Sequence, residues 1–298
     1  MKKVPLGKTG YLISPIIYAG IVSMDERQAD SDNYVAKSID MGVNYFDIAP
    51  SYGNAELIFG QSFKPYRKDV YLACKTTERK AKDAEKEFYQ SLENLKTDWF
   101  DVYQLHSLTT PEDVELAFGP GGTMDLVLKL QQKGLIRKIG FSAHSQYAAL
   151  EALKRYPFDT VMFPLNYLLH MGQGIGSELL KVKQEKGFGL LGIKALVERA
   201  WLNDTEREQS NWPKSWCKPF DQDDVAARLA GMRYSFNMGA DALIPPGNWE
   251  CQSFMMKHYE EVAKTGFTQA DEDLLRERLE ENRNHPFFDK NTGGWSID

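Results

Sequence analysis

The sequence predicts an α/β protein, a (β/α)8 TIM barrel with an N-terminal β-hairpin. Eight short apolar or β-branched runs alternate with longer segments of helical periodicity, in one uninterrupted series. This alternation is typical of parallel β/α units, and eight strands close a barrel whose interior is filled by side chains. The expected strands are Ile16–Gly20, Val43–Ile48, Val70–Lys75, Asp101–His106, Ile136–Ser142, Thr160–Pro164, Gly189–Ile193 and Ala242–Pro245.

The start of the chain supports the same fold. Gly7 and Gly10 are turn signals within the first dozen residues, and they predict a hairpin before the barrel begins. A doubly wound open sheet is the alternative topology. The sequence disfavours it because no GxGxxG motif follows the first expected strand.

Between the strands, apolar residues recur at helical spacing. Phe88, Leu92 and Leu95 predict one helix, and Ser145 stands where the N-cap of another belongs. A third periodic segment follows Asp223 and Asp224, which are suitable cap residues. Its expected apolar face consists of Val225, Leu229, Met232 and Phe236.

The chain is expected to form a single domain over residues 1–298. α/β barrels of this length are routinely one domain, and no linker rich in Pro, Gly or Ser divides the sequence. Two long loops are expected after strands, at about Ser107–Gly122 and Glu198–Gln222. In a barrel, loops at the C-terminal ends of strands build the active site. The second loop contains Trp201, Trp212 and Trp216, and the tail contains Pro286, Phe287, Phe288 and Trp295, which either cover that face or pack on the outside.

Composition restricts the class of partner. The formal net charge of −6 does not favour nucleic acid or an anionic membrane. No run of roughly 18 apolar residues is present, so no membrane span is expected. Cys74, Cys217 and Cys251 form a sparse, odd set without a CxxC motif. They predict reduced thiols in a cytoplasmic protein, and neither a disulfide framework nor a metal site.

Ionisable residues fall at the ends of three successive strands. Asp47 ends the second expected strand and Tyr52 follows five positions later, while Lys75 and His106 end the third and fourth. Parallel strands in a barrel bring these ends together in space. Each residue alone has an ordinary structural explanation, such as a cap, a packed ring or a surface charge. Their joint placement at one edge predicts a catalytic site.

The four side chains suit the protonation of an oxygen. A tyrosine is a poor acid at neutral pH, but a nearby ammonium such as Lys75 favours its phenolate and makes the hydroxyl a better proton donor. A buried lysine needs a partner, which Asp47 provides. His106 is suited to orient a carbonyl oxygen or to pass a proton.

Several motifs resemble the aldo-keto reductase superfamily. The run Met41–Gly53, MGVNYFDIAPSYG, resembles the second-strand signature of that family. The pairs CK at 74–75 and LH at 105–106 are similar to its third and fourth strand ends, and the similarity extends from Leu6 to about Gly247. The resemblance implies a barrel with a hairpin at its closed end, no Rossmann domain, and reduction of aldehydes or ketones by a nicotinamide dinucleotide.

The resemblance also implies residue roles. Tyr52 would be the general acid, Lys75 would tune it with Asp47 as partner, and His106 would help to place the carbonyl. The nicotinamide would lie across the barrel mouth, the pyrophosphate after the seventh strand, and the adenosine phosphate after the eighth. The expected cofactor-binding residues are Gly20, Ile21, Asp47, Ser142, Lys194, Leu196, Pro246, Gly247 and Asn248.

Three positions depart from the family pattern. Ala143 stands where the family usually has an Asn, Met162 where a Gln commonly binds the carboxamide, and Ile193 where an aromatic ring often stacks on the nicotinamide. These departures leave the catalytic set intact and concern only nicotinamide binding.

NADP(H) is the expected cofactor, with NAD(H) as the alternative. The family favours NADPH, whose 2′-phosphate prefers an Arg or Lys partner. In the run after Pro246 and Gly247, however, Glu250 would repel a phosphate, and the first basic residue is Lys257.

The sequence therefore predicts an oxidoreductase that reduces a small-molecule carbonyl compound. One alternative is a cofactor-binding regulatory subunit that keeps the reductase fold, since fold does not fix function. Another is a metal-dependent hydrolase on a similar barrel. Such a site needs several His and carboxylate ligands at strand ends, and the chain has only five histidines. The sequence predicts neither the physiological substrate nor the oligomeric state.

Overall fold

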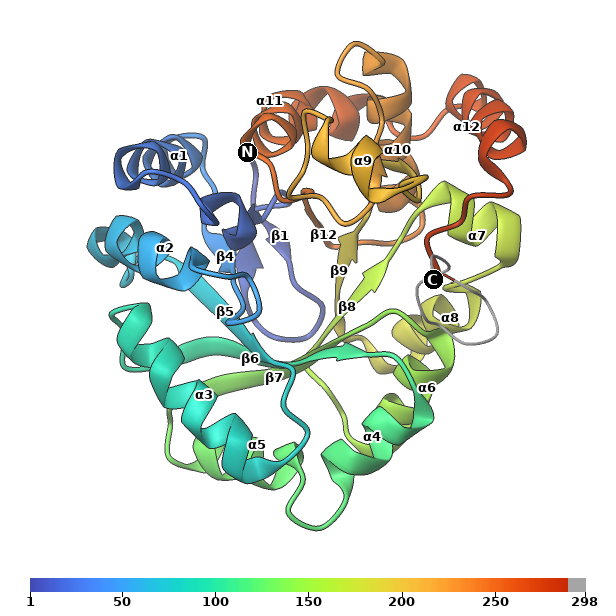
Figure 1. Ribbon diagram of the computed structural model, residues 1–298. Coiled ribbons are helices and arrows are strands. Elements are labelled where there is room, and N and C mark those ends of the chain that lie inside the picture. The colour runs from blue at the N-terminus through green and yellow to red at the C-terminus, as the bar shows by residue number, and fades with distance from the viewer. Residues whose placement is uncertain (289–298) are drawn as a thin grey trace.

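The structure, a computed structural model, describes residues 1–288. In this part of the chain, eight parallel strands form one sheet in the order β12-β9-β8-β7-β6-β5-β4-β3 (Figure 1). The strands are β3 (Tyr18–Ala19), β4 (Tyr45–Asp47), β5 (Tyr71–Thr76), β6 (Phe100–Leu108), β7 (Ile136–Ala143), β8 (Thr160–Pro164), β9 (Gly189–Ile193) and β12 (Ala242–Ile244).

The first and last strands meet and close the ring. The backbone N–H of Ile17 donates to Leu243 O at 3.0 Å, and the N–H of Leu243 donates to Pro15 O at 2.8 Å. The predicted TIM barrel is confirmed. Every expected strand is present at its place in the sequence, and the observed strands differ from the expected ones only at their ends.

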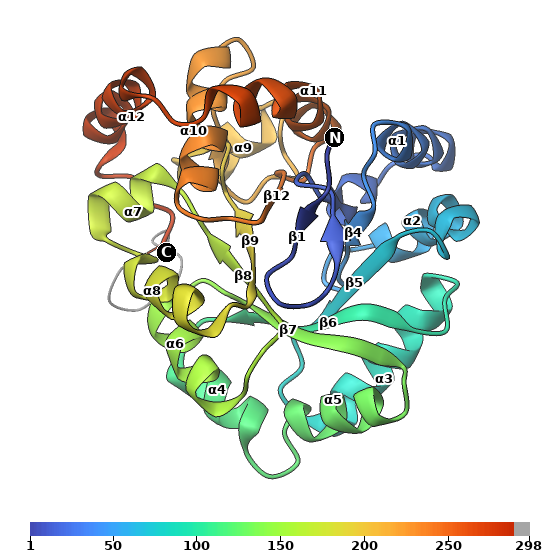
Figure 2. The ribbon, with the colours of Figure 1, turned by 180° about the vertical axis from the view of Figure 1, so that it is seen from behind.

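Helices surround the barrel on the outside (Figures 1 and 2). They are α1 (Gln28–Asp40), α2 (Ala55–Phe63), α3 (Ala81–Asn94), α4 (Pro111–Phe118), α5 (Thr123–Gln132), α6 (Gln146–Arg155), α7 (Tyr167–Gln173), α8 (Ser177–Lys186), α9 (Asp204–Glu208), α10 (Val225–Asn237), α11 (Trp249–Thr265) and α12 (Gln269–Asn282). Two short 3-10 turns, η1 (Gly20–Ser23) and η2 (Lys64–Tyr66), complete the helical segments of the described chain.

Local sequence explains these helices. Phe88 is fully buried on the inner face of α3, and Ser145 caps α6 by accepting the N–H of Ala148 at 3.3 Å. Leu229 is buried on α10, as its periodicity predicts. Val225 is 41% exposed, because it is the first residue of α10 and the buried residues of this helix begin only at Ala227.

The N-terminal hairpin consists of β1 (Val4–Pro5) and β2 (Leu12–Ile13), with Val4 opposite Ile13. It lies across the end of the barrel where the strands begin (Figure 2). Leu6 is fully buried there, and a Cβ added at Gly189, the first residue of β9, would come within 2.5 Å of its Cδ1. A side chain at position 189 would therefore force Leu6 to move, and glycine leaves room for the hairpin at this end of the barrel.

The two segments expected to be long loops contain regular structure. The segment Ser107–Gly122 contains α4, because Thr110 and Asp113 form a capping box that begins a helix. The segment Glu198–Gln222 contains α9, together with the antiparallel pair β10 (Val197–Arg199) and β11 (Lys218–Pro219). The expectation of extended loops was therefore wrong at these places.

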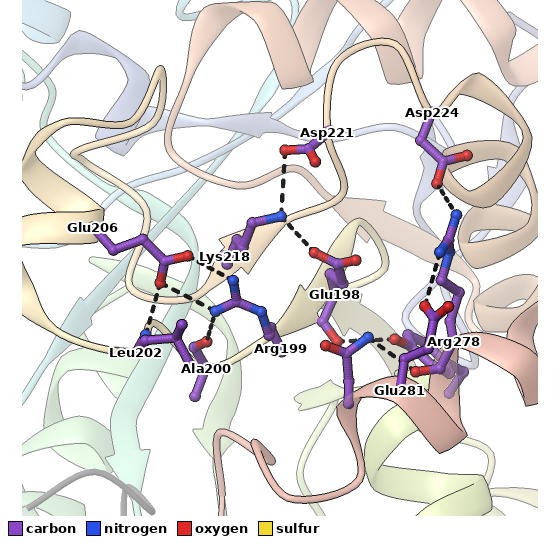
Figure 3. Close-up of polar contacts among 12 residues, drawn as sticks. Glu198, Arg199, Ala200, Leu202, Glu206, Lys218, Asp221, Asp224, Arg278 and Glu281 are labelled. Atoms are coloured by element: carbon purple, nitrogen blue, oxygen red, sulfur yellow. Dashed lines mark hydrogen bonds and ion pairs between the residues drawn. The ribbon is translucent and has the colours of Figure 1, made fainter.

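Ion pairs join residues from different parts of the second segment to one another. Figure 3 shows Lys218 between Glu198 and Asp221, and Arg199 paired with Glu206 at 2.6 Å. The nearby pair of Arg278 with Asp224, at 2.9 Å, joins α12 to the N-cap of α10. The segment after β9 is thus an ordered part of the fold.

Two further features concern the whole described chain. The three cysteines, Cys74, Cys217 and Cys251, are free thiols, and each is fully buried. Within residues 1–288, no helix combines the length and the apolar character that a membrane crossing requires.

Candidate active site

A cavity of about 340 Å³ opens at the C-terminal ends of the barrel strands. Its walls come from most of the strand ends and from the segment after β9. The lining residues are Ala19, Ile21, Asp47, Tyr52, Thr77, His106, Ser107, Ser142, His144, Met162, Ile193, Lys194, Val197, Ser215, Trp216, Ile244, Pro245, Pro246 and Gly247. In a TIM barrel, this end of the sheet is where catalytic groups gather.

Lys75 joins two of the expected catalytic side chains. It is fully buried on β5, and its ammonium donates to the Asp47 carboxylate on β4. The same Nζ donates to Tyr52 Oη at 3.1 Å and to Ile48 O at 3.2 Å. The three donors of the ammonium therefore each have an acceptor, which is the condition for burying this charge.

The electrostatics of this group follow from burial and from the short contacts. Burial alone lowers the pKa of Lys75, but the neighbouring Asp47 and Tyr52 raise it overall, so the ammonium stays charged. Burial raises the pKa of Tyr52, and the Lys75 charge acts in the opposite direction. The phenol is therefore protonated at neutral pH and lies next to a cation that would stabilise its phenolate.

Gln104 is a member of this cluster that the sequence reasoning missed. It is fully buried inside the barrel on β6, and its Nε2 donates to Asp47 Oδ1 at 3.1 Å. The carboxylate of Asp47 is thus held on one oxygen by Gln104 and on the other by Lys75. In the sequence, this role was indicated only by the position of Gln104 two residues before His106, which places both side chains on the same face of the strand.

His106 lies at the cavity wall, half-buried. Its Nδ1 is 3.3 Å from Ser51 Oγ, and its ring meets the ring of Tyr52 edge-on, with centroids 5.9 Å apart. Burial lowers its pKa well below the usual range, and the charges of Lys75 and Arg79 act in the same direction. The imidazole is therefore neutral at physiological pH and is able to donate from one ring nitrogen.

The expected cofactor residues divide into two groups. Six of them line the cavity, namely Ile21, Asp47, Ser142, Lys194, Pro246 and Gly247. The other three do not. Gly20 faces Ile48, and Leu196 is fully buried in the core. Asn248 caps α11 by accepting the N–H of Glu250 at 2.8 Å, and its Nδ2 donates to Asn211 O.

The departures from the family pattern have clear structural consequences. Met162 and Ile193 both line the cavity, so its wall is apolar at these two positions. Ser142 Oγ accepts the backbone N–H of Ser107 at 2.7 Å, while Ala143 is fully buried. No side-chain amide therefore lies next to Ser142 on β7.

Asn166 is a second polar residue that the sequence reasoning missed. Its Nδ2 donates to Lys194 O at 2.9 Å and to Val197 O at 2.7 Å. Lys194 has a positive φ of 72°, a conformation that is uncommon for a residue other than glycine. The buried amide of Asn166 holds this bend, and with it the start of the segment after β9.

The tryptophans of that segment have different surroundings. Trp201 and Trp212 are buried and serve packing, whereas Trp216 is 41% exposed and lines the cavity with its ring centroid 5.7 Å from that of Tyr52. In the tail, Phe288 is fully buried and stacks on His144 at 4.4 Å, so the described part of the tail lies against the cavity side. Trp295 lies outside the described residues.

A model of the aldo/keto reductase family matches residues 20–266. The chain is 28% identical over 176 residues to the uncharacterized oxidoreductase YqkF of Bacillus subtilis (strain 168), which covers 54% of this chain and 55% of that protein. It is 27% identical over 209 residues to L-galactose dehydrogenase of Arabidopsis thaliana, which covers 64% of each. The matches thus span about half to two thirds of the length of these curated relatives.

Solved structures show the same fold. An aldo-keto reductase from Bacillus halodurans, solved in its holo form, superposes with a TM-score of 0.68 at 20% sequence identity. The match covers 94% of this chain and 96% of that chain. At this level of identity, the likeness concerns the barrel and its arrangement.

Proposed function

We propose that this chain, which belongs to the aldo/keto reductase family, reduces an aldehyde or ketone to an alcohol with NAD(P)H. The observation that carries the proposal is the contact of Tyr52 Oη with the buried ammonium of Lys75 at the wall of the cavity. A phenol next to a fixed positive charge is a proton donor for an oxygen that gains negative charge. The relatives named as oxidoreductase and dehydrogenase support the same reaction class.

A nicotinamide cofactor, when bound, would supply a hydride for the carbonyl carbon. Tyr52 donates its proton from Oη to the carbonyl oxygen, which becomes the alcohol hydroxyl. The phenolate that remains is stabilised by Lys75, whose own charge is compensated by Asp47. The neutral ring of His106 donates a hydrogen bond that orients the carbonyl oxygen toward Tyr52.

The residues present fit a dinucleotide phosphate. Lys194 brings an ammonium to the cavity, and Pro246 and Gly247 in the lining lead directly into the N-terminus of the 17-residue helix α11. Backbone N–H groups and the helix dipole at such a terminus favour an anion. We propose that Ser142, Lys194 and Gly247 contact the cofactor, and that Gly20, Leu196 and Asn248 act through the backbone around it.

We propose NADP(H) as the preferred cofactor, with NAD(H) as the second. The family expectation supports NADP(H), while the local chemistry opposes it. Glu250 is in the first turn of α11 and pairs with the buried Arg228 at 2.7 Å, and Trp212 Nε1 lies 3.4 Å from the same carboxylate. The Arg228 guanidinium is therefore already paired with an acid.

The substrate in this proposal is a small carbonyl compound with an apolar body. Trp216, Met162, Ile193 and Val197 give the cavity an apolar wall next to the proposed acid. The three buried free thiols agree with action in the reducing cytoplasm. We further propose that residues 1–298 act as a single domain.

The test is turnover of wild-type protein and Tyr52→Phe on a panel of aldehydes and ketones, with NADPH and with NADH. The variant is expected to lose roughly 10²–10⁴-fold in kcat, as loss of a positioned acid does, while cofactor binding stays unchanged. Near-full activity of the variant would refute the role of Tyr52. Tight cofactor binding by a wild-type protein that turns over no carbonyl compound would instead favour a regulatory subunit.

A further inference from the structure

The strand that carries His106 pairs irregularly with its neighbour at that residue. The pairing of β6 with β7 shifts register between Leu105 and Leu108, so His106 and Ser107 form a bulge. Ser107 has a positive φ of 56°, which is uncommon for a residue with a side chain. A bulge of this kind bends the strand and changes the direction of its side chains. Here it occurs at the residue proposed to orient the substrate carbonyl.

A single side chain binds both carbonyl oxygens of the bulge. Arg79 Nη2 donates to His106 O at 2.7 Å and to Ser107 O at 3.1 Å. Because the regular ladder is broken at these residues, the guanidinium replaces part of the strand pairing. It satisfies backbone acceptors that a bulge would otherwise leave to solvent.

Arg79 is itself held from two other sides. Its Nη1 donates to Thr77 O at 2.9 Å, just after β5, and its Nε donates to Asp113 Oδ1 at 3.2 Å. The other oxygen of Asp113 accepts the backbone N–H groups of Thr109 and Thr110 at the start of α4. The guanidinium thus connects the end of β5, the bulge of β6 and the cap of α4, and its side chain is only 12% exposed.

We propose that Arg79 is a positioning residue for His106. By fixing the bulge, it directs the His106 ring toward the cavity and toward Tyr52. The inference rests on the proposed function, in which His106 orients the carbonyl. Neither the sequence motifs nor the expected catalytic set included Arg79.

The geometry requires the planar fork of arginine. One guanidinium reaches Thr77 O, the two bulge carbonyls and the Asp113 carboxylate at once, whereas a lysine ammonium is a point donor at the end of a flexible stem. Arg79→Lys should therefore hold the bulge only in part. Arg79→Gln should release it.

The first experiment is a double-mutant cycle on kcat. Arg79→Gln is expected to lower kcat by up to roughly 100-fold, as a displacement of about 1 Å in an active site does, with little change in KM. In a His106→Ala background, Arg79→Gln should have almost no further effect, because the residue it positions is gone. Equal fold-losses in both backgrounds would overturn the proposal.

Arg67→Gln is the matched control. Arg67 also pairs with an aspartate and donates to backbone carbonyls, with Asp101 at 2.9 Å and Trp99 O at 2.8 Å, but it lies at the opposite end of β6. This variant is expected to lower Tm and to leave kcat unchanged. A fall in kcat equal to that of Arg79→Gln would show that loss of any buried arginine that contacts this strand is enough, and would overturn the proposal.

The second experiment does not depend on activity. The chain has five histidines, so histidine-labelled protein gives an NMR spectrum that single substitutions can assign. In Arg79→Gln, the ring signals of His106 and of His144, whose Nδ1 is 3.3 Å from Ser107 Oγ, should shift, while those of His170 and His258 stay in place. Arg79→Lys should give a smaller shift of the same signals, and it serves if the Gln variant does not fold.

The two experiments separate the two possible failures. If wild-type protein reduces no carbonyl compound, the proposed function fails, and the NMR signals still decide whether Arg79 holds His106. If the protein is an active reductase but the His106 signal is unchanged in both Arg79 variants, the proposed function stands and the positioning role is wrong.

Discussion

Replacing Lys75 with methionine tests the central charge pair without any assumption about the reaction. The ammonium is fully buried and compensates Asp47, which is itself 2% exposed. Methionine fills a similar volume but cannot donate. In Lys75→Met, therefore, the Asp47 carboxylate keeps only the hydrogen bond from Gln104 and becomes a buried charge without a counter-ion.

The expected cost is large. Removing one member of a buried ion pair typically destabilises a protein by about 3–5 kcal/mol. For a chain of 298 residues, that corresponds to a fall in Tm of roughly 5–8 °C. By contrast, Lys181→Met removes the partner of Glu178 from a surface pair, whose side chains are 69% and 53% exposed. It should cost about 0–1 kcal/mol.

The pH dependence identifies the cause. Without Lys75, burial raises the folded-state pKa of Asp47 with no cation to oppose it. A carboxyl whose pKa is raised on folding takes up its proton at low pH, so the destabilisation is absent in acid and appears as pH rises through the folded-state pKa. In Lys75→Met with Asp47→Asn, no charge remains, so this double variant should recover most of the lost stability at neutral pH.

Urea unfolding followed by circular dichroism at a series of pH values measures these differences. The gap in unfolding free energy between Lys75→Met and the double variant should widen from acid to neutral pH. A constant gap, or a double variant less stable than Lys75→Met at neutral pH, would refute the view that an uncompensated Asp47 charge causes the loss.

Three further predictions concern activity and binding. The proposed acid must be protonated, so activity falls as pH rises through the pKa of Tyr52. Because Lys75 opposes the rise in that pKa, Lys75→Met should move this fall in kcat/KM to higher pH. A fall at an unchanged pH would exclude Lys75 from the site. Glu250→Ala releases Arg228 next to the N-terminus of α11 and should strengthen NADPH binding relative to NADH binding. Dissociation constants for both cofactors from fluorescence quenching measure this. Equally tight binding of both by wild-type protein would contradict the proposed preference. Trp216→Ala removes an apolar wall next to Tyr52 and should raise KM for large carbonyl substrates more than for small ones, whereas a uniform change would assign Trp216 to packing.

Features that depend on local sequence could be predicted. The strands could be predicted because each is a short apolar run between turn signals. The proposed catalytic set was suggested by the same pattern, because Asp47, Lys75 and His106 each end such a run. The structure then brings Lys75 into contact with Asp47 and Tyr52, as the chemistry of a buried lysine requires.

Features that depend on contacts between distant segments could not be predicted. Gln104 and Asn166 are single amides in otherwise ordinary segments, and their roles exist only because Asp47 and the bend at Lys194 lie across from them in the barrel. Arg79 is similar, since its acceptors lie 27 and 28 residues further along the chain. The helix α4 was missed for a different reason, because eight residues between polar turn signals carry too little periodicity to distinguish a short helix from a loop.

The three buried thiols also provide a way to measure local opening of the structure. Cys74 is on a barrel strand, Cys217 in the segment after β9 and Cys251 in α11, so each reports on a different part of the molecule. A thiol that is fully covered reacts with a labelling reagent only when its surroundings open. The order in which the three sites are labelled under native conditions would therefore show whether the segment beside the cavity opens separately from the barrel or only together with it.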